Sequence, residues 1–421
     1  MKDLILQGDC LEKLKVLEDN SVDLICTDPP YGYSFMGKDW DKAVPSVDIW
    51  KECLRVLKPG AFALVMSAPR QDVLSQMIVR IGEAGFNTDF TSLYWTYASG
   101  FPKAMNIGKK VDKRMGTPRE RVEGGVGTDE GYSGGFKPNE AQSNEAKLLN
   151  GSYGGFQPKP AVEIIIVAMK PLSEKSYVDQ ALKNGKGITW LDNCRIPTNG
   201  ETLDAGGRGK HGRGDGYGFE PTGGVEIDQT KGRFPANLLV GDDALNDGQT
   251  RKASATKRNR ATIGSFGMPN DVTPEYGDSG SYSRYFDLDA WAKTLPFLIV
   301  PKASKSEKNR GLEEFEEKQV VGGGGGIGDY LEDVNSASGK YGSEKAPGKN
   351  FHPTVKPLKL MSYLITLGSR EGEIVLDPFC GSGTTCLAAK ELKRNYIGIE
   401  REAEYVEIAK ARLEAIPNSL F

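Results

Sequence analysis

Two short segments near opposite ends of the chain contain residues that could form a reaction site. Residues 27–31 read Thr-Asp-Pro-Pro-Tyr and follow the apolar run 22–27, while residues 376–385 read Leu-Asp-Pro-Phe-Cys-Gly-Ser-Gly-Thr-Thr and follow the run 373–377. In each case a strand-like run ends in residues typical of a loop. We therefore expect both segments at the carboxyl edge of a parallel sheet, where ligands bind in such folds.

The first segment has the acceptors that an amine substrate needs. The two prolines carry no N–H and hold a stiff extended path, so the carbonyls of Asp28 and Pro29 are free to accept hydrogen bonds. The exocyclic amine of a base is a poor nucleophile, because its lone pair is delocalised into the ring. Acceptors at Asp28 and Pro29 would favour a pyramidal nitrogen and stabilise its developing positive charge, and Tyr31 would stack on an extruded base. Taken alone, the tetrapeptide 28–31 is more typical of a Pro-Pro turn with a capping Asp and a packing Tyr.

The second segment is suited to a nucleoside that carries an amino-acid tail. Gly381 and Gly383 allow a tight turn that brings backbone amides close to a ligand, and the helix expected over 382–392 would present its N-terminus to a carboxylate. The next apolar run, 396–399, ends in Glu400, an acid suited to a ribose diol. An ordinary glycine-rich turn is the alternative, and the acid at the strand tip argues against it.

In this combination the chain resembles the amino-methylating DNA methyltransferases of the beta group. Residues 232–237 and 301–305 resemble segments of phage-type and mobile-element members of that family. That family uses S-adenosylmethionine and places its Asp-Pro-Pro-Tyr motif before its cofactor motif. The matching segments are Gly8-Asp9-Cys10 with Leu11 and Leu14, residues 27–31, Trp95 with residues 100–103, residues 352–357, residues 377–385 and residues 397–400.

The resemblance implies site-specific methylation of the N6 amine of a flipped adenine in DNA. It assigns the catalytic role to Asp28, Pro29, Pro30 and Tyr31. It assigns cofactor binding to Asp9, Cys10, Asp28, Lys356, Asp377, Pro378, Phe379, Cys380, Gly381, Ser382, Gly383, Thr384, Glu400 and Arg401. His352 is given no proton transfer, and we expect it to be structural or adjacent to the cofactor.

Three alternatives to adenine methylation stay open. Asp28 at the first motif position is typical of the adenine subgroup, whereas Ser there is commoner in enzymes that methylate the N4 amine of cytosine. Methyltransferases that act on RNA or on a protein glutamine usually carry Asn there and place the cofactor motif first. A non-catalytic DNA-binding relative would show decay in the reactive loops.

The motif order predicts the fold, an α/β doubly wound Rossmann-like methyltransferase sheet with circularly permuted motifs and a large irregular insertion. The strands that end at Asp377 and Thr27 must then be neighbours, and a helix over 402–415 must pack toward the strand at 4–6. We also expect helix 47–57 stopped by Pro59-Gly60, strand 61–66, helix 71–84, strand 89–97 and strand 163–168.

The 421 residues exceed one typical domain. We divide them into the N-terminal catalytic half (1–115), a flexible Gly-rich loop (116–160), a catalytic-domain strand (161–170), a target-recognition domain (171–350) and the cofactor-binding half (351–421).

The net charge and the cysteine content limit the kinds of partner and cofactor that we expect. The net charge of −3 gives no overall cationic signature, so a DNA-binding face must come from local clusters. We assign it to Lys103, Lys109, Lys110, Arg114, Arg258 and Arg260; the DNA would be a base-flipped duplex or a single strand. A homodimer and a companion restriction endonuclease are left open.

The six cysteines form no Cys-x-x-Cys pair, so we expect free thiols and no metal site. No apolar run approaches the length of a membrane-spanning helix, and we expect a cytoplasmic protein.

Overall fold

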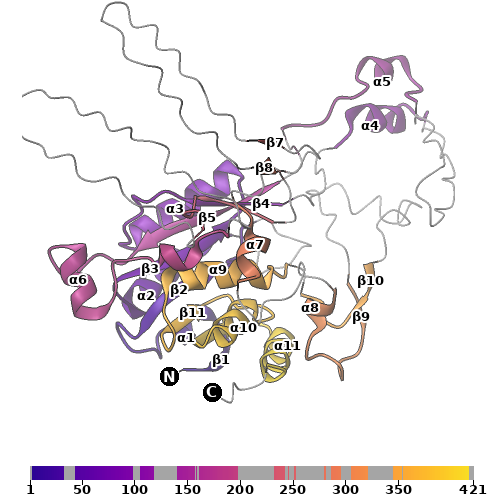
Figure 1. Ribbon diagram of the computed structural model, residues 1–421. Helices are drawn as coiled ribbons and strands as arrows, with labels where there is room; N and C mark the ends of the chain where they lie inside the picture. Colours follow the sequence, from indigo (N-terminus) through magenta and orange to yellow (C-terminus); the bar gives the residue numbers. More distant parts are fainter. Residues whose placement is uncertain are drawn as a thin grey trace, which may run out of the picture. The chain divides into compact units, whose positions relative to one another are not determined.

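Figure 1 shows the computed structural model of the chain. The structure describes residues 2–32, 43–97, 105–117, 140–156, 158, 161–197, 232–241, 245, 251–252, 279–280, 286–294, 305–320, 345–352 and 354–416. They fall into two compact units. The first comprises Met1–Ala98, Val162–Gly322 and Glu344–Phe421, and the second comprises Ser99–Ala161 and Gly323–Ser343.

The first unit is built on one sheet with the strand order β1-β12-β11-β2-β3-β5-β4-β6. Seven of these strands run parallel, and β5 alone is antiparallel to both of its neighbours. The strands are β1 (Leu4–Gln7), β2 (Val22–Thr27), β3 (Leu57–Ser67), β4 (Leu93–Thr96), β5 (Val162–Met169), β6 (Leu238–Val240), β11 (Ile374–Asp377) and β12 (Asn395–Glu400). Two small antiparallel pairs join β7 (Arg251–Lys252) to β8 (Ser279–Gly280), and β9 (Lys318–Val320) to β10 (Lys345–Gly348).

The two ends of the chain meet in the middle of this sheet. β11 pairs in parallel with β2, and the register places Leu376 beside Ile25. β1 pairs with β12 at the edge, and helix α11 (Ala403–Glu414) packs against both of these strands. The prediction that the strands ending at Asp377 and Thr27 are neighbours is therefore confirmed, as is the return of the C-terminal helix to the first strand.

Helices cover both faces of the sheet, which confirms the α/β doubly wound fold. Successive residues of a strand point to opposite faces, so Leu24 joins one core cluster with Leu364 of α9, and Ile25 joins the other with Trp50 of α2. The helices of this unit are α1 (Cys10–Leu14), α2 (Val47–Val56), α3 (Gln71–Glu83), α6 (Tyr177–Asn184), the 3-10 turn η3 (Leu191–Cys194), α7 (Leu288–Ala292), α8 (Lys305–Asn309), α9 (Leu358–Gly368), α10 (Thr384–Glu391) and α11.

The local prediction around Pro59-Gly60 was wrong. These residues do not stop α2, which ends at Val56, and β3 begins directly at Leu57 and runs through them. Gly60 has φ +78° and pairs through its N–H with the Lys170 carbonyl at 3.0 Å, so a bulge keeps the strand continuous. β4, in contrast, is shorter than the predicted strand 89–97.

Part of the range expected to form a target-recognition domain belongs to the sheet unit. β6 is the edge strand beside β4, and its residues Leu239 and Val240 are buried. Likewise α7 and η3 pack against α9. These short apolar segments bury their side chains against the sheet and its covering helix α9, so they form part of the sheet unit. The target-recognition role of 171–350 and its boundaries stay predictions.

The second unit contains α4 (Ile107–Arg114) and α5 (Asn144–Leu148). Asp112 is fully buried between them and accepts hydrogen bonds from the Ser143 N–H at 2.8 Å, the Ser143 hydroxyl at 2.9 Å and the Gln142 N–H at 3.2 Å. The expected flexible loop at 116–160 thus includes a helix that is anchored to α4.

No helix in the described part of the chain is long and apolar enough to span a membrane.

Candidate active site

The ends of β2 and β11 are joined through one buried carboxylate. Asp377 accepts from the Thr27 hydroxyl at 2.6 Å, from the Thr385 hydroxyl at 2.6 Å and from the Phe379 N–H at 3.1 Å. Its side chain is almost fully buried, and burial raises its pKa to about 6. Asp377 therefore ties the two motif loops to each other through the chain's own groups, and its direct contact with a cofactor stays a prediction.

The residue after Thr27 lies in a cluster of four polar side chains. The Lys356 Nζ is 2.7 Å from Asp28 Oδ2, and the Tyr31 hydroxyl donates to Asp28 Oδ1 at 2.5 Å. Glu163 on β5 completes the cluster, because its Oε2 is 3.2 Å from the Lys356 Nζ and 3.4 Å from the Tyr31 hydroxyl. Two remote parts of the sequence, at Glu163 and Lys356, thus meet the loop that carries Asp28 and Tyr31.

Electrostatics keep the protons of this cluster on its donors. For Lys356, burial opposes the charge, but the Asp28 and Glu163 carboxylates outweigh burial and raise its pKa above the ordinary value. Burial, and then the charge of Asp28, raises the pKa of Tyr31. Burial also raises the pKa of Glu163, and the Lys356 ammonium opposes that shift. Lys356 and Tyr31 therefore both act as donors to Asp28 near neutral pH.

The glycine loop between β11 and α10 needs its glycines. Gly381 has φ +50° and Gly383 has φ +83°, a region that favours glycine. A Cβ on Gly381 would lie 2.6 Å from the His352 Nε2, so the loop has no room there for a side chain. The Gly381 N–H donates to Glu400 at 2.9 Å, which joins this loop to the end of β12.

A buried arginine supports the same loop from behind. Arg412 of α11 is fully buried, and its Nη1 donates to the Ser382 carbonyl at 2.6 Å, the Ser382 hydroxyl at 3.1 Å and the Thr384 hydroxyl at 3.3 Å. The sequence interpretation missed this residue. A positively charged residue among the apolar positions of the C-terminal helix, between Ala409 and Leu413, could have indicated this buried role.

His352 packs against the glycine loop as a neutral ring. Its ring centroid is 4.5 Å from that of Tyr405, and its Nδ1 accepts from the Thr354 N–H at 3.4 Å. Burial lowers its pKa to about 3, and the charges of Lys356 and Arg412 act in the same direction. The ring thus contacts the predicted cofactor loop as a neutral imidazole near neutral pH, with its Nδ1 as a hydrogen-bond acceptor.

The remaining predicted cofactor residues lie near the tips of β1, β11 and β12. Asp9 caps α1 by accepting from the Leu11 N–H at 2.9 Å, and Cys10 begins that helix, where burial and then the charge of Asp9 raise its pKa to about 12. The Gly8 N–H donates to the Glu400 carbonyl at 2.9 Å, which holds the β1 loop against β12. Pro378, Phe379 and Cys380 form the start of the glycine loop, with the Phe379 ring edge-on to Trp50. Arg401 differs from them: it is 51% exposed and pairs with Glu402.

The predicted DNA-binding residues are divided between the second unit and the part of the chain that is not described. Lys109, Lys110 and Arg114 lie on α4, where Lys109 and Arg114 are exposed. Lys103, Arg258 and Arg260 lie outside the described residues.

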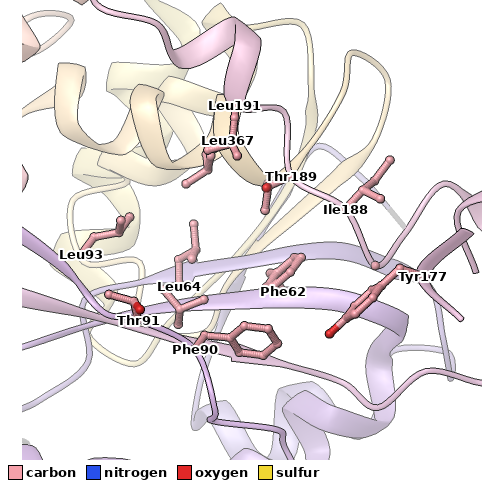
Figure 2. A pocket seen from close by; sticks show the side chains of 13 residues that line it. Phe62, Leu64, Phe90, Thr91, Leu93, Tyr177, Ile188, Thr189, Leu191 and Leu367 are labelled. Carbon is pink, nitrogen blue, oxygen red and sulfur yellow. The ribbon is translucent and has the colours of Figure 1, made fainter. Parts of the chain in front are cut away.

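A separate cavity of about 480 Å³ opens on one face of the sheet. Figure 2 shows Phe62, Phe90 and Leu367 lining it, and its wall includes no charged side chain. It contains no predicted site residue. Among the described residues, no group of three or more His, Cys, Asp or Glu side chains could hold a metal ion.

Comparison with known proteins finds a family model that matches the C-terminal part of the chain. Residues 257–411 match a family model described as DNA methylase. The expected resemblance to DNA methyltransferases is confirmed. The matched range includes His352, Lys356, the glycine loop and Glu400, and it ends within α11.

Curated DNA methylases match shorter stretches at higher identity. The Type II methyltransferase M2.DpnII of Streptococcus pneumoniae is 48% identical over 88 residues, which are 21% of this chain and 32% of that protein. The Type II methyltransferase M.HinfI of Haemophilus influenzae is 48% identical over 86 residues, which are 20% of this chain and 24% of that protein. The chain thus spans a third or less of the length of these relatives.

Two solved structures align with nearly the whole chain at low sequence identity. The PvuII DNA methyltransferase (cytosine-N4-specific) aligns with a TM-score of 0.42 and 15% identity, over 100% of this chain and 89% of that one. An M1.HpyAVI-SAM complex aligns with a TM-score of 0.36 and 16% identity, over 97% and 99%.

We predict that the His352 imidazole stays neutral from about pH 8 down to about pH 5. Its folded pKa of about 3 lies below the ordinary value. The stability that the neutral ring contributes is therefore fully present above its unfolded pKa, and it is lost as the pH falls toward the folded pKa. Histidine NMR can follow the ring, with His352→Asn used to assign its signal. A signal from His352 that titrates at an ordinary histidine pKa would show the packing to be wrong.

Proposed function

We propose that this chain is a site-specific DNA methyltransferase, which transfers a methyl group from S-adenosylmethionine to the N6 amine of a flipped adenine and acts in the cytoplasm. One observation carries the proposal. The Asp28 carboxylate and the glycine loop after β11 belong to adjacent parallel strands, and Thr27 donates to Asp377 at 2.6 Å across their ends. An amine acceptor and a nucleoside-binding loop thereby share one edge of the sheet.

The residues present fit the cofactor. At Gly381 the backbone packs against the His352 ring and leaves no room for a Cβ. Glu400 accepts one backbone N–H on each carboxylate oxygen, and each oxygen keeps a lone pair for a diol. Ser382, Gly383 and Thr384 would hold the methionine part, with Asp9 and Cys10 beside the adenine. When bound, S-adenosylmethionine supplies an electrophilic methyl group.

The chain's own chemistry takes place at Asp28. In this structure its two oxygens accept from Lys356 and Tyr31. A target amine would replace one of these donors and give its N–H bond to the carboxylate, with the Pro29 carbonyl as a second acceptor. Both acceptors stabilise the positive charge that develops on the nitrogen as it reacts, which is stabilisation specific to the transition state.

Asp28 at the first motif position favours adenine as the target base. Cytosine is the second candidate, because its N4 amine has the same chemistry and would meet the same acceptors. The target base therefore has to be read out directly, together with its sequence context.

Asp28→Ala should abolish methyl transfer and leave most of the cofactor affinity. The substitution removes an acceptor that acts chiefly in the transition state, while the glycine loop is held by other groups. Single-molecule sequencing of DNA from cells that express either protein reads the modified base and its site together. We expect N6-methyladenine at one recurring sequence with the wild type and none with the variant. N4-methylcytosine would move the assignment to cytosine, and unmodified DNA with the wild type would refute the proposal.

Gly381→Ala should weaken S-adenosylmethionine binding by about tenfold or more, since the added methyl group forces the loop and His352 apart. Gly372→Ala is the matched control, because Gly372 also has a positive φ of +80° but nothing lies within 4 Å of its added Cβ. Both variants strain the backbone, and only the first fills occupied space. Calorimetry that shows equal affinities for the two variants would contradict a role of the glycine loop in binding the cofactor.

Neutralising α4 should weaken DNA binding without sequence preference. In the triple variant, Lys109, Lys110 and Arg114 are replaced by Gln. Each lost phosphate contact reduces the slope of log affinity against log salt concentration by about 0.9. Replacing Lys15, Lys51 and Lys183, which are 52%, 59% and 57% exposed on the first unit, removes the same charge elsewhere. Equal salt slopes for the two triple variants, measured by fluorescence anisotropy, would exclude α4 from the DNA interface.

A further inference from the structure

We propose that Glu163 is a positioning residue for Asp28: it holds Lys356 and Tyr31 beside the catalytic carboxylate and retains the donor that a target amine displaces there. This inference rests on the proposed function. It concerns a residue outside all the motifs that predicted the site.

The geometry gives Glu163 the same two donors that Asp28 has. Its Oε2 lies 3.2 Å from the Lys356 Nζ, compared with 2.7 Å for Asp28. It lies 3.4 Å from the Tyr31 hydroxyl, compared with 2.5 Å for Asp28. In this structure both donors therefore lie closer to Asp28, and a small displacement moves either of them toward Glu163.

Burial makes this second acceptor necessary. The side chains of Lys356 and Glu163 are only 11% and 18% exposed. An ammonium displaced from Asp28 into such a site would lose its partner, and an unpaired buried charge is strongly unfavourable. Glu163 removes that penalty, because Lys356 exchanges one carboxylate for another when the amine arrives.

The strand direction explains how Glu163 reaches the site. β5 is antiparallel to β3, and its register pairs Ile164 with Ser67, the last residue of β3. Glu163 therefore lies just beyond the carboxyl end of β3, at the edge where β2 ends in Thr27. It is the only acid in an otherwise apolar strand of eight residues.

Two substitutions distinguish the role of Glu163 as a hydrogen-bond acceptor from the role of its negative charge. Glu163→Gln keeps an oxygen acceptor and removes the charge, and Glu163→Ala removes both. Because a hydrogen bond to a charged group is worth a factor of roughly ten to a hundred, we expect kcat to fall about tenfold in E163Q and about a hundredfold in E163A. The dissociation constant for S-adenosylmethionine, measured by calorimetry, should stay within about twofold of wild type.

A double-mutant cycle tests whether Glu163 acts through Lys356. In a Lys356→Met background, E163Q should change kcat by less than about twofold, because the ammonium that Glu163 holds is gone. A merely structural role would give the same relative loss in both backgrounds. Glu373→Gln is the matched control: Glu373 is ion-paired with Lys186 at 2.5 Å at the opposite end of β11, and its loss should leave kcat unchanged.

Each outcome decides between the two proposals. Wild-type protein that methylates DNA while E163Q keeps full kcat overturns the role of Glu163 alone. That role is also overturned if the E163Q loss is equally large in the Lys356→Met background, or if it parallels a loss of cofactor affinity. Wild-type protein that methylates no DNA overturns both the proposed function and this inference.

Discussion

The site depends on the parallel pairing of β2 with β11. The strand ends are joined by the hydrogen bond from Thr27 to Asp377, two residues that are 350 positions apart in sequence. This contact is buried, so the Thr27 hydroxyl and the Asp377 carboxylate need each other as partners. Asp377 also accepts from Thr385 at the start of α10. The amine-binding loop and the glycine loop are thus fixed by one residue, and a shift in the register of β2 against β11 would separate them.

In this arrangement the Asp28 carboxylate already has two hydrogen-bond donors. Lys356 arrives from the segment that leads into α9, and Tyr31 from the same loop as Asp28. Catalysis by Asp28 then involves an exchange of hydrogen bonds rather than the filling of an empty acceptor. Such an exchange costs little only if the displaced donor finds another acceptor nearby, which relates the energetics of the loop to β5 on the other side of β3.

Much of this could be predicted from the sequence, because the motif residues come directly after apolar runs. A run such as 22–27 followed by Asp-Pro-Pro marks both the strand and its functional end, and the parallel edge then brings Asp28 and the glycine loop together. Glu163 and Arg412 could not be predicted in the same way. Glu163 is the single polar residue of an apolar strand, and Arg412 lies on the buried face of an amphipathic helix. The partner of each depends on the pairing of elements that lie far apart in sequence. For the same reason, β6 could not be assigned to this sheet from its own three residues.

The direction of β5 accounts for why Glu163 escapes a motif-based interpretation. In a parallel sheet, the residues that reach the functional edge follow their strands, so a search for site residues looks at strand ends. An antiparallel strand presents its first residues at that edge instead. Glu163 therefore precedes its strand core, Ile164 to Val167, and on sequence alone it looks like an ordinary polar residue at a strand start. In a mixed sheet of this kind, the candidates for functional side chains must include the starts of antiparallel strands that border the catalytic loop.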